Sequence, residues 1–275
     1  MTGFLNDETE MAARPYFGYW GKAAGALPPD ARHAPGWHSL PYHCLDVAAV
    51  GYEYLVHTPA LRSLLQECLG DVDDESLSCW LAFWLALHDL GKFAEGFQGQ
   101  KPDLFKLLRD RASVKPYLIR HDSLGWLYWR EVLAEQARDE TWFGEGTEEA
   151  IYSLDWWMRA VTGHHGQPPE SRHCAWDHHF DRRQDKPAIS SFIADLSGLF
   201  LTDTVRAIPG PLDEESFEHF SKCLSWWVAG ITVLADWLGS NTDWARRAPV
   251  SSASGKTSLV LTQGVIQIRK STMPL

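Results

Sequence analysis

The chain has 275 residues, of which 45% are hydrophobic and 22% charged, as is usual for a globular protein with one large domain. The formal net charge of −11 is unusual for a protein that holds nucleic acid by its own surface, because such surfaces are normally basic. Composition alone therefore disfavours nucleic acid as a substrate, unless metal ions or partner proteins supply the positive charge.

Three features of the sequence bear on where the protein works. The polar, acidic N-terminal stretch lacks the basic and then apolar pattern of a signal peptide. No uncharged apolar run reaches the length of a membrane span. Five scattered cysteines without a C-x-x-C pair argue against a disulfide scaffold and fit a reducing compartment. We therefore expect a cytoplasmic protein.

The spacing of apolar residues predicts helices along most of the chain and few strands before residue 258. The predicted helices cover residues 41–55, 76–90, 122–138, 147–162 and 215–238. Segment 76–90 is apolar on all sides and is expected to be buried, and the long helix 215–238 is expected to be buried as well. Segments 20–41 and 166–190 are rich in Pro, His and Gly or charge, which is typical of loops.

The composition changes near the C-terminus, where residues 246–257 are rich in Ser and Ala and residues 258–269 could form one or two strands. We expect an all-α domain over residues 1–245 and an irregular or β-like tail over residues 246–275. Most of the tryptophans fall in helix-like segments, which predicts a bulky aromatic core rather than base-stacking surfaces. The tryptophans assigned to this core are Trp80, Trp84, Trp126, Trp129, Trp156, Trp157, Trp226 and Trp227.

The adjacent His88 and Asp89 stand at the end of the apolar helix 76–90. Burying both is costly unless something pairs with them, and a divalent cation is a suitable partner for neutral imidazole and carboxylate. Successive helical residues point about 100° apart, so the pair can serve two neighbouring ions, or one ion where the helix ends. Lys92 would share a face with His88 if the helical turn persists past Gly91, and could there hold a phosphate oxygen. The alternative is a His-Asp pair with a purely structural role.

His164 and His165 lie between two glycines at the end of the predicted helix 147–162, where a flexible backbone lets both rings turn toward an ion. Asp236 lies in the apolar run ITVLADWLGS, where an unpaired carboxylate would be costly, so it is either a ligand or a hydrogen-bonded structural residue. Two further histidines are unremarkable in isolation but complete the set of candidates, namely His43 and His121.

Together, five histidines and two aspartates stand near the ends of separate predicted helices. Nitrogen and oxygen ligands without cysteine favour Mn, Fe, Co, Ni or Zn over Mg, which prefers oxygen alone. Two such ions about 3.5–4 Å apart would activate a water molecule and stabilise both oxygens of an in-line attack on phosphorus.

These motifs resemble those of the HD-domain nuclease of the CRISPR-associated nuclease–helicase of type I systems, and most closely the type I-E branch. They occur in the family's order between residues 19 and 240. The matching stretches are YWGK (19–22), YHCLDVAAV (42–50), LHDLGKF (87–93), His121 followed by GWLYW (125–129), AVTGHHG (160–166) and LADWLGS (234–240).

The resemblance implies an HD-domain helical bundle with a dinuclear metal centre, in which Asp89 bridges the ions and Lys92 lies near the scissile phosphate. Asp89 and Lys92 are therefore the expected catalytic residues. The expected cofactors are two divalent transition metal ions, with Mn, Co, Ni or Fe favoured over Mg. The metal ligands that the resemblance implies are His43, His88, Asp89, His121, His164, His165 and Asp236.

The resemblance also implies partners. Proteins of this family nick and degrade single-stranded DNA that the crRNA-guided Cascade complex exposes, and they act with a superfamily 2 helicase. Delivery of the strand by Cascade and a helicase would explain why the nuclease face need not be basic. The alternatives are an HD phosphohydrolase that acts on nucleotides and a catalytically idle HD-like module that binds Cascade.

The sequence departs from the family pattern after the last motif. Relatives of this branch usually continue into a helicase, but only 18 residues follow Thr257 here. The stretch SGKTS (254–258) echoes a phosphate-binding motif whose first glycine is replaced by Val250, so we expect no ATPase activity. One His- and Cys-containing segment is more typical of a surface loop than of a zinc site, and its candidate residues are His173, Cys174, His178 and His179.

Overall fold

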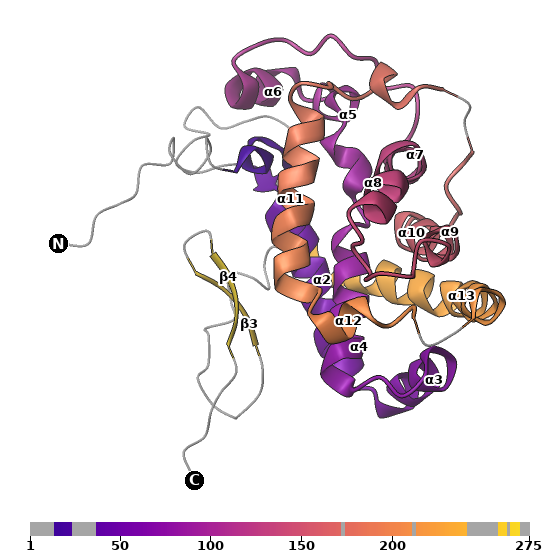
Figure 1. Cartoon of the computed structure of the whole chain (residues 1–275). Coiled ribbons are helices and arrows are strands. Elements are labelled where there is room, and N and C mark those ends of the chain that lie inside the picture. The colour runs from indigo at the N-terminus through magenta and orange to yellow at the C-terminus, as the bar shows by residue number, and fades with distance from the viewer. Residues whose placement is uncertain are drawn as a thin grey trace.

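A computed structural model shows a mainly helical protein, which confirms the all-α prediction (Figure 1). The residues that it describes are 14–23, 37–171, 174–210 and 213–240, with the backbone alone of 258–262 and 265–269. The elements in chain order are η1 (Pro15–Gly18), β1 (Trp20–Ala23), β2 (Trp37–Ser39), α2 (Leu40–Val56), α3 (Pro59–Leu69), α4 (Asp74–Ala86), η2 (Leu90–Phe93), α5 (Glu95–Gln98), α6 (Pro102–Arg109), α7 (His121–Tyr128), η3 (Trp129–Leu133), α8 (Ala134–Asp139), α9 (Ala150–Ser153), α10 (Asp155–Thr162), η4 (Trp176–His178), α11 (Asp185–Phe200), α12 (Asp203–Arg206), α13 (Glu214–Gly239), β3 (Ser258–Thr262) and β4 (Val265–Arg269). No helix in these ranges is long and apolar enough to cross a membrane.

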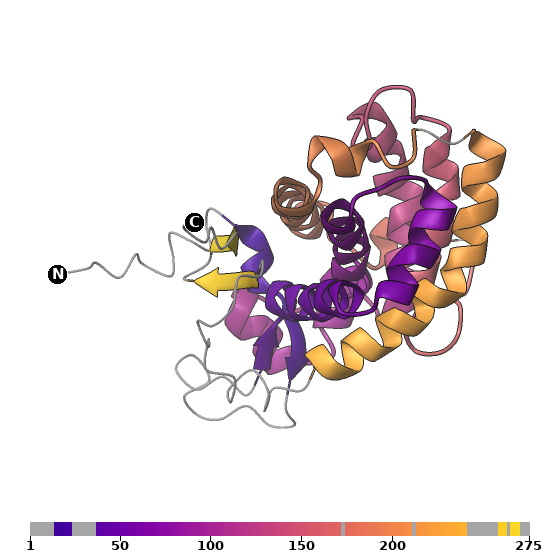
Figure 2. The same ribbon diagram turned by 90° about the horizontal axis from the view of Figure 1, so that it is seen from below.

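Helices α2 and α4 pack against each other at the centre of the bundle, and α11, α10 and α13 surround them (Figures 1 and 2). Asp73 caps α4 by accepting a hydrogen bond from the backbone N–H of Ser76 at 2.9 Å. Every residue of α4 from Ser76 onward is buried, as predicted for this apolar segment. Trp80 and Trp84 pack edge to face, with ring centroids 5.6 Å apart, which confirms an aromatic core at this helix.

The end of α4 differs from the prediction that a helix continues to residue 90. The α-helix stops at Ala86, and hydrogen bonds of the 3₁₀ type then form the η2 turn, with Lys92 N–H donating to the Asp89 carbonyl at 2.8 Å. Gly91 explains how this turn fits: a Cβ there would lie 1.8 Å from the His121 carbonyl oxygen. The glycine lets η2 press directly on the first turn of α7 and so brings Asp89 close to His121.

Helix α13 confirms the predicted helix 215–238 but corrects its burial. Asp213 caps it, and the helix buries one face, with Leu224, Val228, Ile231 and Ala235 in the core. The other face is open, and Trp226 is 83% exposed. The assignment of Trp226 and Trp227 to the core is therefore wrong, because the described residues cover only one face of this helix.

Four further predictions were correct only in outline. The predicted helix 122–138 is α7, a π-helical turn η3 and α8 in succession, and the predicted helix 147–162 is divided into α9 and α10 at Leu154. The segment predicted as a loop over residues 20–41 contains the antiparallel pair β1–β2, in which Lys22 lies opposite His38. The segment predicted as a loop over residues 166–190 contains η4 and the start of α11.

Near the C-terminus, β3 and β4 pair as antiparallel strands, with Ser258 opposite Arg269, which confirms the strands predicted within residues 258–269. Residues 246–257 lie outside the described residues, and so does the phosphate-binding echo apart from the backbone of Ser258. The proposed division into a domain over residues 1–245 and a tail over residues 246–275 stays a prediction.

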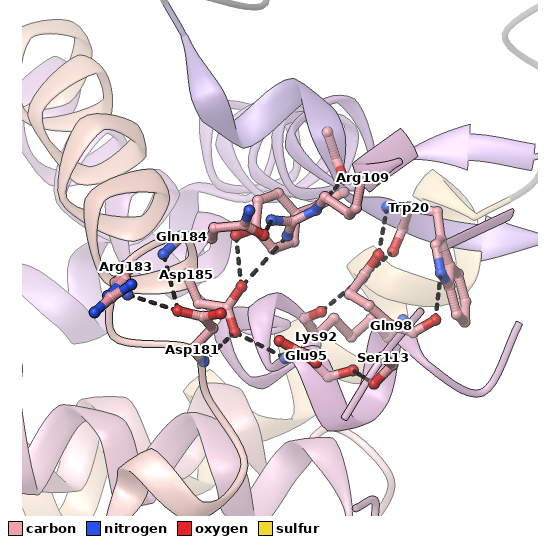
Figure 3. A network of polar contacts seen from close by, with 12 residues as sticks. Trp20, Lys92, Glu95, Gln98, Arg109, Ser113, Asp181, Arg183, Gln184 and Asp185 are labelled. Atoms are coloured by element: carbon pink, nitrogen blue, oxygen red, sulfur yellow. Dashed lines mark hydrogen bonds and ion pairs between the residues drawn. The ribbon is translucent and has the colours of Figure 1, made fainter. Parts of the chain in front are cut away.

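A buried polar network ties the start of α11 to the N-terminal region and to the segment around Lys92 and Glu95 (Figure 3). The Asp185 carboxylate accepts hydrogen bonds from Tyr19 OH at 2.7 Å and from the backbone N–H groups of Glu95 and Asp181 at 2.8 and 2.7 Å. It also forms an ion pair with Arg109 at 3.3 Å. Four donors around one buried carboxylate make the fold at this point depend on a single side chain.

We expect Asp185→Ala to lower the free energy of unfolding by about 3–5 kcal/mol, because it leaves the Arg109 guanidinium buried without its partner. Urea denaturation followed by circular dichroism measures this change. Glu67→Ala, on the exposed face of α3, is the matched control and should stay within about 0.5 kcal/mol of the unchanged protein. A loss below about 1 kcal/mol for Asp185→Ala would show that the network contributes little.

Candidate metal centre

The structure brings all seven predicted ligand residues together at one place. Each comes from the end of a helix or the turn beside it: His43 from α2, His88 and Asp89 from the turn after α4, His121 from the start of α7, His164 and His165 from the turn after α10, and Asp236 from the end of α13. Six of them form two groups of three, each with its ligand atoms within 4.8 Å of one another, and Asp236 lies beside the first group.

The first group consists of His43, His88 and Asp89, and all three are buried. Oδ2 of Asp89 lies 2.8 Å from Nε2 of His43 and 3.2 Å from Nε2 of His88. Asp236 approaches the same group, with its Oδ1 3.4 Å from Nε2 of His43. One carboxylate oxygen from each aspartate therefore faces the same two imidazoles.

The second group consists of His121, His164 and His165. Oδ1 of Asp89 lies 3.3 Å from Nε2 of His121 and 3.5 Å from Nε2 of His164. His165 reaches the group from its solvent-exposed side, with its Nε2 2.9 Å from that of His121. The two oxygens of Asp89 thus face different histidine groups, which is the arrangement of a carboxylate that bridges two cations.

Backbone carbonyls fix the orientation of two of the imidazole rings. Nδ1 of His88 lies 2.8 Å from the Leu85 carbonyl oxygen, and Nδ1 of His164 lies 3.1 Å from the Val161 carbonyl oxygen. A carbonyl oxygen only accepts, so in both rings Nδ1 carries the hydrogen. In the neutral ring this leaves Nε2 with a lone pair directed at the cluster, as a metal ligand requires.

The electrostatics of the site favour the protonation states that bind metal. Burial lowers the pKa of His43 to about 4 and that of His164 to about 3. Burial on its own would raise the pKa of Asp89, but Lys92 and the surrounding histidines hold it well below its usual value. Burial likewise opposes ionisation of Asp236, yet its neighbours, His88 first among them, lower its pKa to about 2. Neutral imidazoles and charged carboxylates are the forms that ligate cations.

The hydrogen bonding of the cluster shows that it fits a pair of cations. Oδ1 and Oδ2 of Asp89 are buried without a regular hydrogen bond, although the Lys92 ammonium pairs with Oδ2, and Nδ1 of His43 is buried without a partner. Lone pairs of neutral imidazoles and of a carboxylate would face one another at these distances, which is unfavourable in a buried site. Cations between them would remove the repulsion, so these donors fit two ions of a metal that accepts nitrogen as well as oxygen.

Lys92 is buried beside Asp89, and its Nζ lies 2.6 Å from Oδ2 of Asp89 and 3.3 Å from the Gly21 carbonyl oxygen. The expectation that Lys92 shares a face with His88 depended on a continuous α-helix past Gly91. The tighter η2 turn instead pairs Lys92 with Asp89, three residues earlier.

Sequence reasoning missed two residues next to the cluster. Lys22, in the YWGK stretch, has its Nζ 3.5 Å from Oδ1 of Asp236 and also contacts Oγ of Ser240. Gln98 in α5 is buried and makes hydrogen bonds to the backbone of both Trp20 and Lys92. The family-like YWGK stretch is a signal that could have pointed to Lys22, whereas no pattern distinguishes Gln98 from an ordinary surface glutamine.

The His- and Cys-containing segment near residue 175 does not form a metal cluster among the residues that the structure describes there. His179 is buried, and its Nδ1 lies 3.0 Å from the Pro116 carbonyl oxygen. His173 lies outside the described residues.

A helical bundle that gathers an adjacent His-Asp pair and histidines from neighbouring helices is the architecture of an HD domain. The chain belongs to the family of Cas3 HD domains, since the family model described as "Cas3, HD domain" matches residues 20–245. This match confirms the family resemblance of the motifs.

Known relatives agree with this assignment. The chain is 31% identical over 243 residues to the CRISPR-associated endonuclease/helicase Cas3 of Escherichia coli (strain K12), a match that covers 82% of this chain and 26% of that protein. It thus spans about a quarter of the length of this curated relative. A solved structure of a CRISPR-associated protein is 26% identical with a TM-score of 0.59, over 84% of this chain and 23% of that one. A chain of a CRISPR RNA-guided surveillance complex in a pre-nicking state shares the fold, at 21% identity and a TM-score of 0.55, over 84% of this chain and 25% of that one.

Proposed function

We propose that this chain is a metal-dependent deoxyribonuclease that hydrolyses phosphodiester bonds, mainly in single-stranded DNA, during CRISPR interference. The observation that carries the proposal is Asp89, whose two buried oxygens face two separate histidine groups. The E. coli relative, which is named an endonuclease/helicase, supports the same activity. The acidic chain itself needs little positive surface if other proteins deliver the strand.

In this proposal Asp89 serves both ions, with His43, His88 and Asp236 on one side and His121, His164 and His165 on the other. Two divalent ions, of Mn, Co, Ni or Fe rather than Mg, would supply an activated water and stabilise charge on the phosphate. Lys92 holds the Asp89 carboxylate at its correct orientation through the 2.6 Å ion pair. Its ammonium group has a third N–H, which we assign to a phosphate oxygen of the substrate.

The partners belong to the proposal as well. A chain with the same fold lies in a CRISPR RNA-guided surveillance complex, so we propose that a Cascade complex exposes the DNA strand for this chain in the cytoplasm. A superfamily 2 helicase would move the strand through the site, a proposal supported by the name of the E. coli relative, an endonuclease/helicase. Residues 1–245 are proposed as the nuclease domain and residues 246–275 as a tail.

Removal of metal is the first test of this function. We expect protein stripped with EDTA to be inactive, and Mn, Co or Ni to restore cutting of single-stranded DNA without ATP. The assay compares single-stranded DNA, double-stranded DNA and a panel of nucleotides. Cutting in excess chelator, or a strict requirement for ATP, would contradict the proposal. Hydrolysis of nucleotides alone would identify the chain as a nucleotide phosphohydrolase. Binding to Cascade without hydrolysis of any substrate would identify it as a catalytically idle module.

A further inference from the structure

Two lysines border the metal centre, and the structure places them differently. Lys92 is buried and has its ammonium between the Asp89 carboxylate and the Gly21 carbonyl. The Lys22 side chain is 37% exposed, and its Nζ lies at the longer distance of 3.5 Å from Oδ1 of Asp236. Of the two ammonium groups, that of Lys22 is therefore the one open to a molecule arriving from solvent.

The exposure of the cluster shows from which side a substrate must arrive. The side chains of His43, His88 and Asp89 are fully buried. Asp236 is 21% exposed, and His165 is solvent-exposed. The open rim of the cluster thus includes Asp236, and Lys22 is the cation beside it.

The backbone of Lys22 is fixed although its side chain is partly free. Gln98 clamps β1: its Oε1 accepts from Trp20 N–H at 3.1 Å, and its Nε2 donates to the Trp20 and Lys92 carbonyls at 2.9 and 2.7 Å (Figure 3). Gly21 lets the strand lie close to α2, because a Cβ there would be 3.2 Å from Cβ of His43. β1 is therefore held against both the η2 turn and the first turn of α2, while the Lys22 side chain is partly exposed and its Nζ contacts Asp236 and Ser240.

Other groups compete with the Lys22 ammonium for the Asp236 carboxylate, so an anion of the substrate can take the place of this carboxylate. Oδ1 of Asp236 already accepts a hydrogen bond from Ser240 Oγ at 2.7 Å and lies 3.4 Å from His43. A cation at the first histidine group would share the charge of this carboxylate and weaken its attraction for Lys22. A phosphodiester at the same rim would offer the ammonium an anionic oxygen in place of the carboxylate.

We propose that Lys22 is a substrate-binding residue that contacts a phosphate of the DNA strand at the open rim of the metal centre. The inference rests on the proposed function, because it takes the ligand to be a phosphodiester. It assigns the two lysines different positions on the substrate: Lys92 orients Asp89 and contacts a phosphate oxygen inside the cluster, and Lys22 holds the strand at the exposed rim.

Binding of single-stranded DNA by the Mn-loaded chain tests this role apart from hydrolysis. A fluorescein-labelled phosphorothioate oligothymidylate keeps the backbone charge and resists cutting, so fluorescence anisotropy gives its Kd at several salt concentrations. For Lys22→Ala we expect the Kd to rise about tenfold at low salt and the salt slope to fall by about 0.7, the value for one lost phosphate contact on a single strand. Lys22→Arg, which keeps the charge, should restore the slope.

Lys106→Ala, at an exposed lysine on α6, is the matched control and should leave the slope unchanged. Metal content separates the proposed role from a structural one: Lys22→Ala should keep its metal. An unchanged salt slope, or loss of metal in step with loss of binding, would overturn the role of Lys22 while leaving the nuclease proposal intact. DNA binding that depends on Lys22, without cutting by any metal form, would overturn the nuclease proposal alone. No DNA binding by the unchanged protein would overturn both.

Discussion

Asp89→Asn should lose bound metal together with nuclease activity, and the rate should fall by at least about 10²-fold. The substitution keeps the size of the side chain but removes the negative charge that faces both histidine groups. A neutral amide is a poor bridge between two cations, and its NH₂ group would point at one of them. Metal analysis by mass spectrometry and a single-stranded DNA cleavage assay measure the two losses.

Two further variants distinguish the role of Asp89 as a bridging ligand from the effects of substitutions at residues that do not bind metal. Lys92→Ala should keep metal but cut more slowly, because it removes the cation beside Asp89 and not a ligand. Asp155→Asn is a matched control, since the Asp155 carboxylate accepts from Trp126 Nε1 at 2.7 Å and an amide oxygen can accept the same bond. If Asp89→Asn keeps full metal content and nearly normal cutting, Asp89 does not bridge two ions.

Gly91→Ala should have the second largest effect, on both stability and metal content. The new Cβ would lie 1.8 Å from the His121 carbonyl oxygen and 2.6 Å from the Gly125 backbone nitrogen. Backbone atoms cannot turn aside as a flexible side chain can, so η2 and α7 must separate. We expect a loss of about 3 kcal/mol or more in the free energy of unfolding, measured by urea denaturation.

The same separation should carry His121 away from Asp89, so any Gly91→Ala protein that folds should bind fewer ions. Gly198→Ala in α11 is the matched control, because no atom lies within 4 Å of a Cβ at that position. It should be neutral, or stabilising by up to about 1 kcal/mol, since alanine is the better helix former. Equal stability of the two alanine variants would show that the contact between η2 and α7 is not tight.

The family and the set of candidate ligands could be predicted from the sequence because their residue types conflict with their surroundings. His88, Asp89 and Asp236 are polar residues in apolar segments, where their burial demands a partner. The helices α2 and α13 were also predictable, since each combines helical spacing with a proline or an acidic cap at its start.

Other features depend on contacts between distant segments and could not be predicted. α4 ends at Ala86 because η2 packs on α7, which no local pattern reveals. In the second half of α13 the open face is apolar like the buried face, so the sequence alone could not show that Trp226 is uncovered. The strand β1 is held by β2 and by Gln98, which are both separated from it in the sequence.

Helix α11 was missed although its signal is present. Its buried residues Ala188, Ile189, Phe192, Ile193, Leu196 and Phe200 follow helical spacing. Only residues 185–190 fall in the predicted loop, because they continue a stretch rich in Pro, His and charge, and no element was predicted over residues 191–200. The bridging position of Asp89 was implied only by the family resemblance, since it requires the distances between four separate helix ends.

Anomalous X-ray scattering from crystals of the Mn- or Co-loaded protein tests the dinuclear centre most directly. We expect two peaks about 3.5–4 Å apart on either side of the Asp89 carboxylate. One should lie among His43, His88 and Asp236, and the other among His121, His164 and His165. A single peak, or two peaks of which neither touches Asp89, would contradict the two-ion centre.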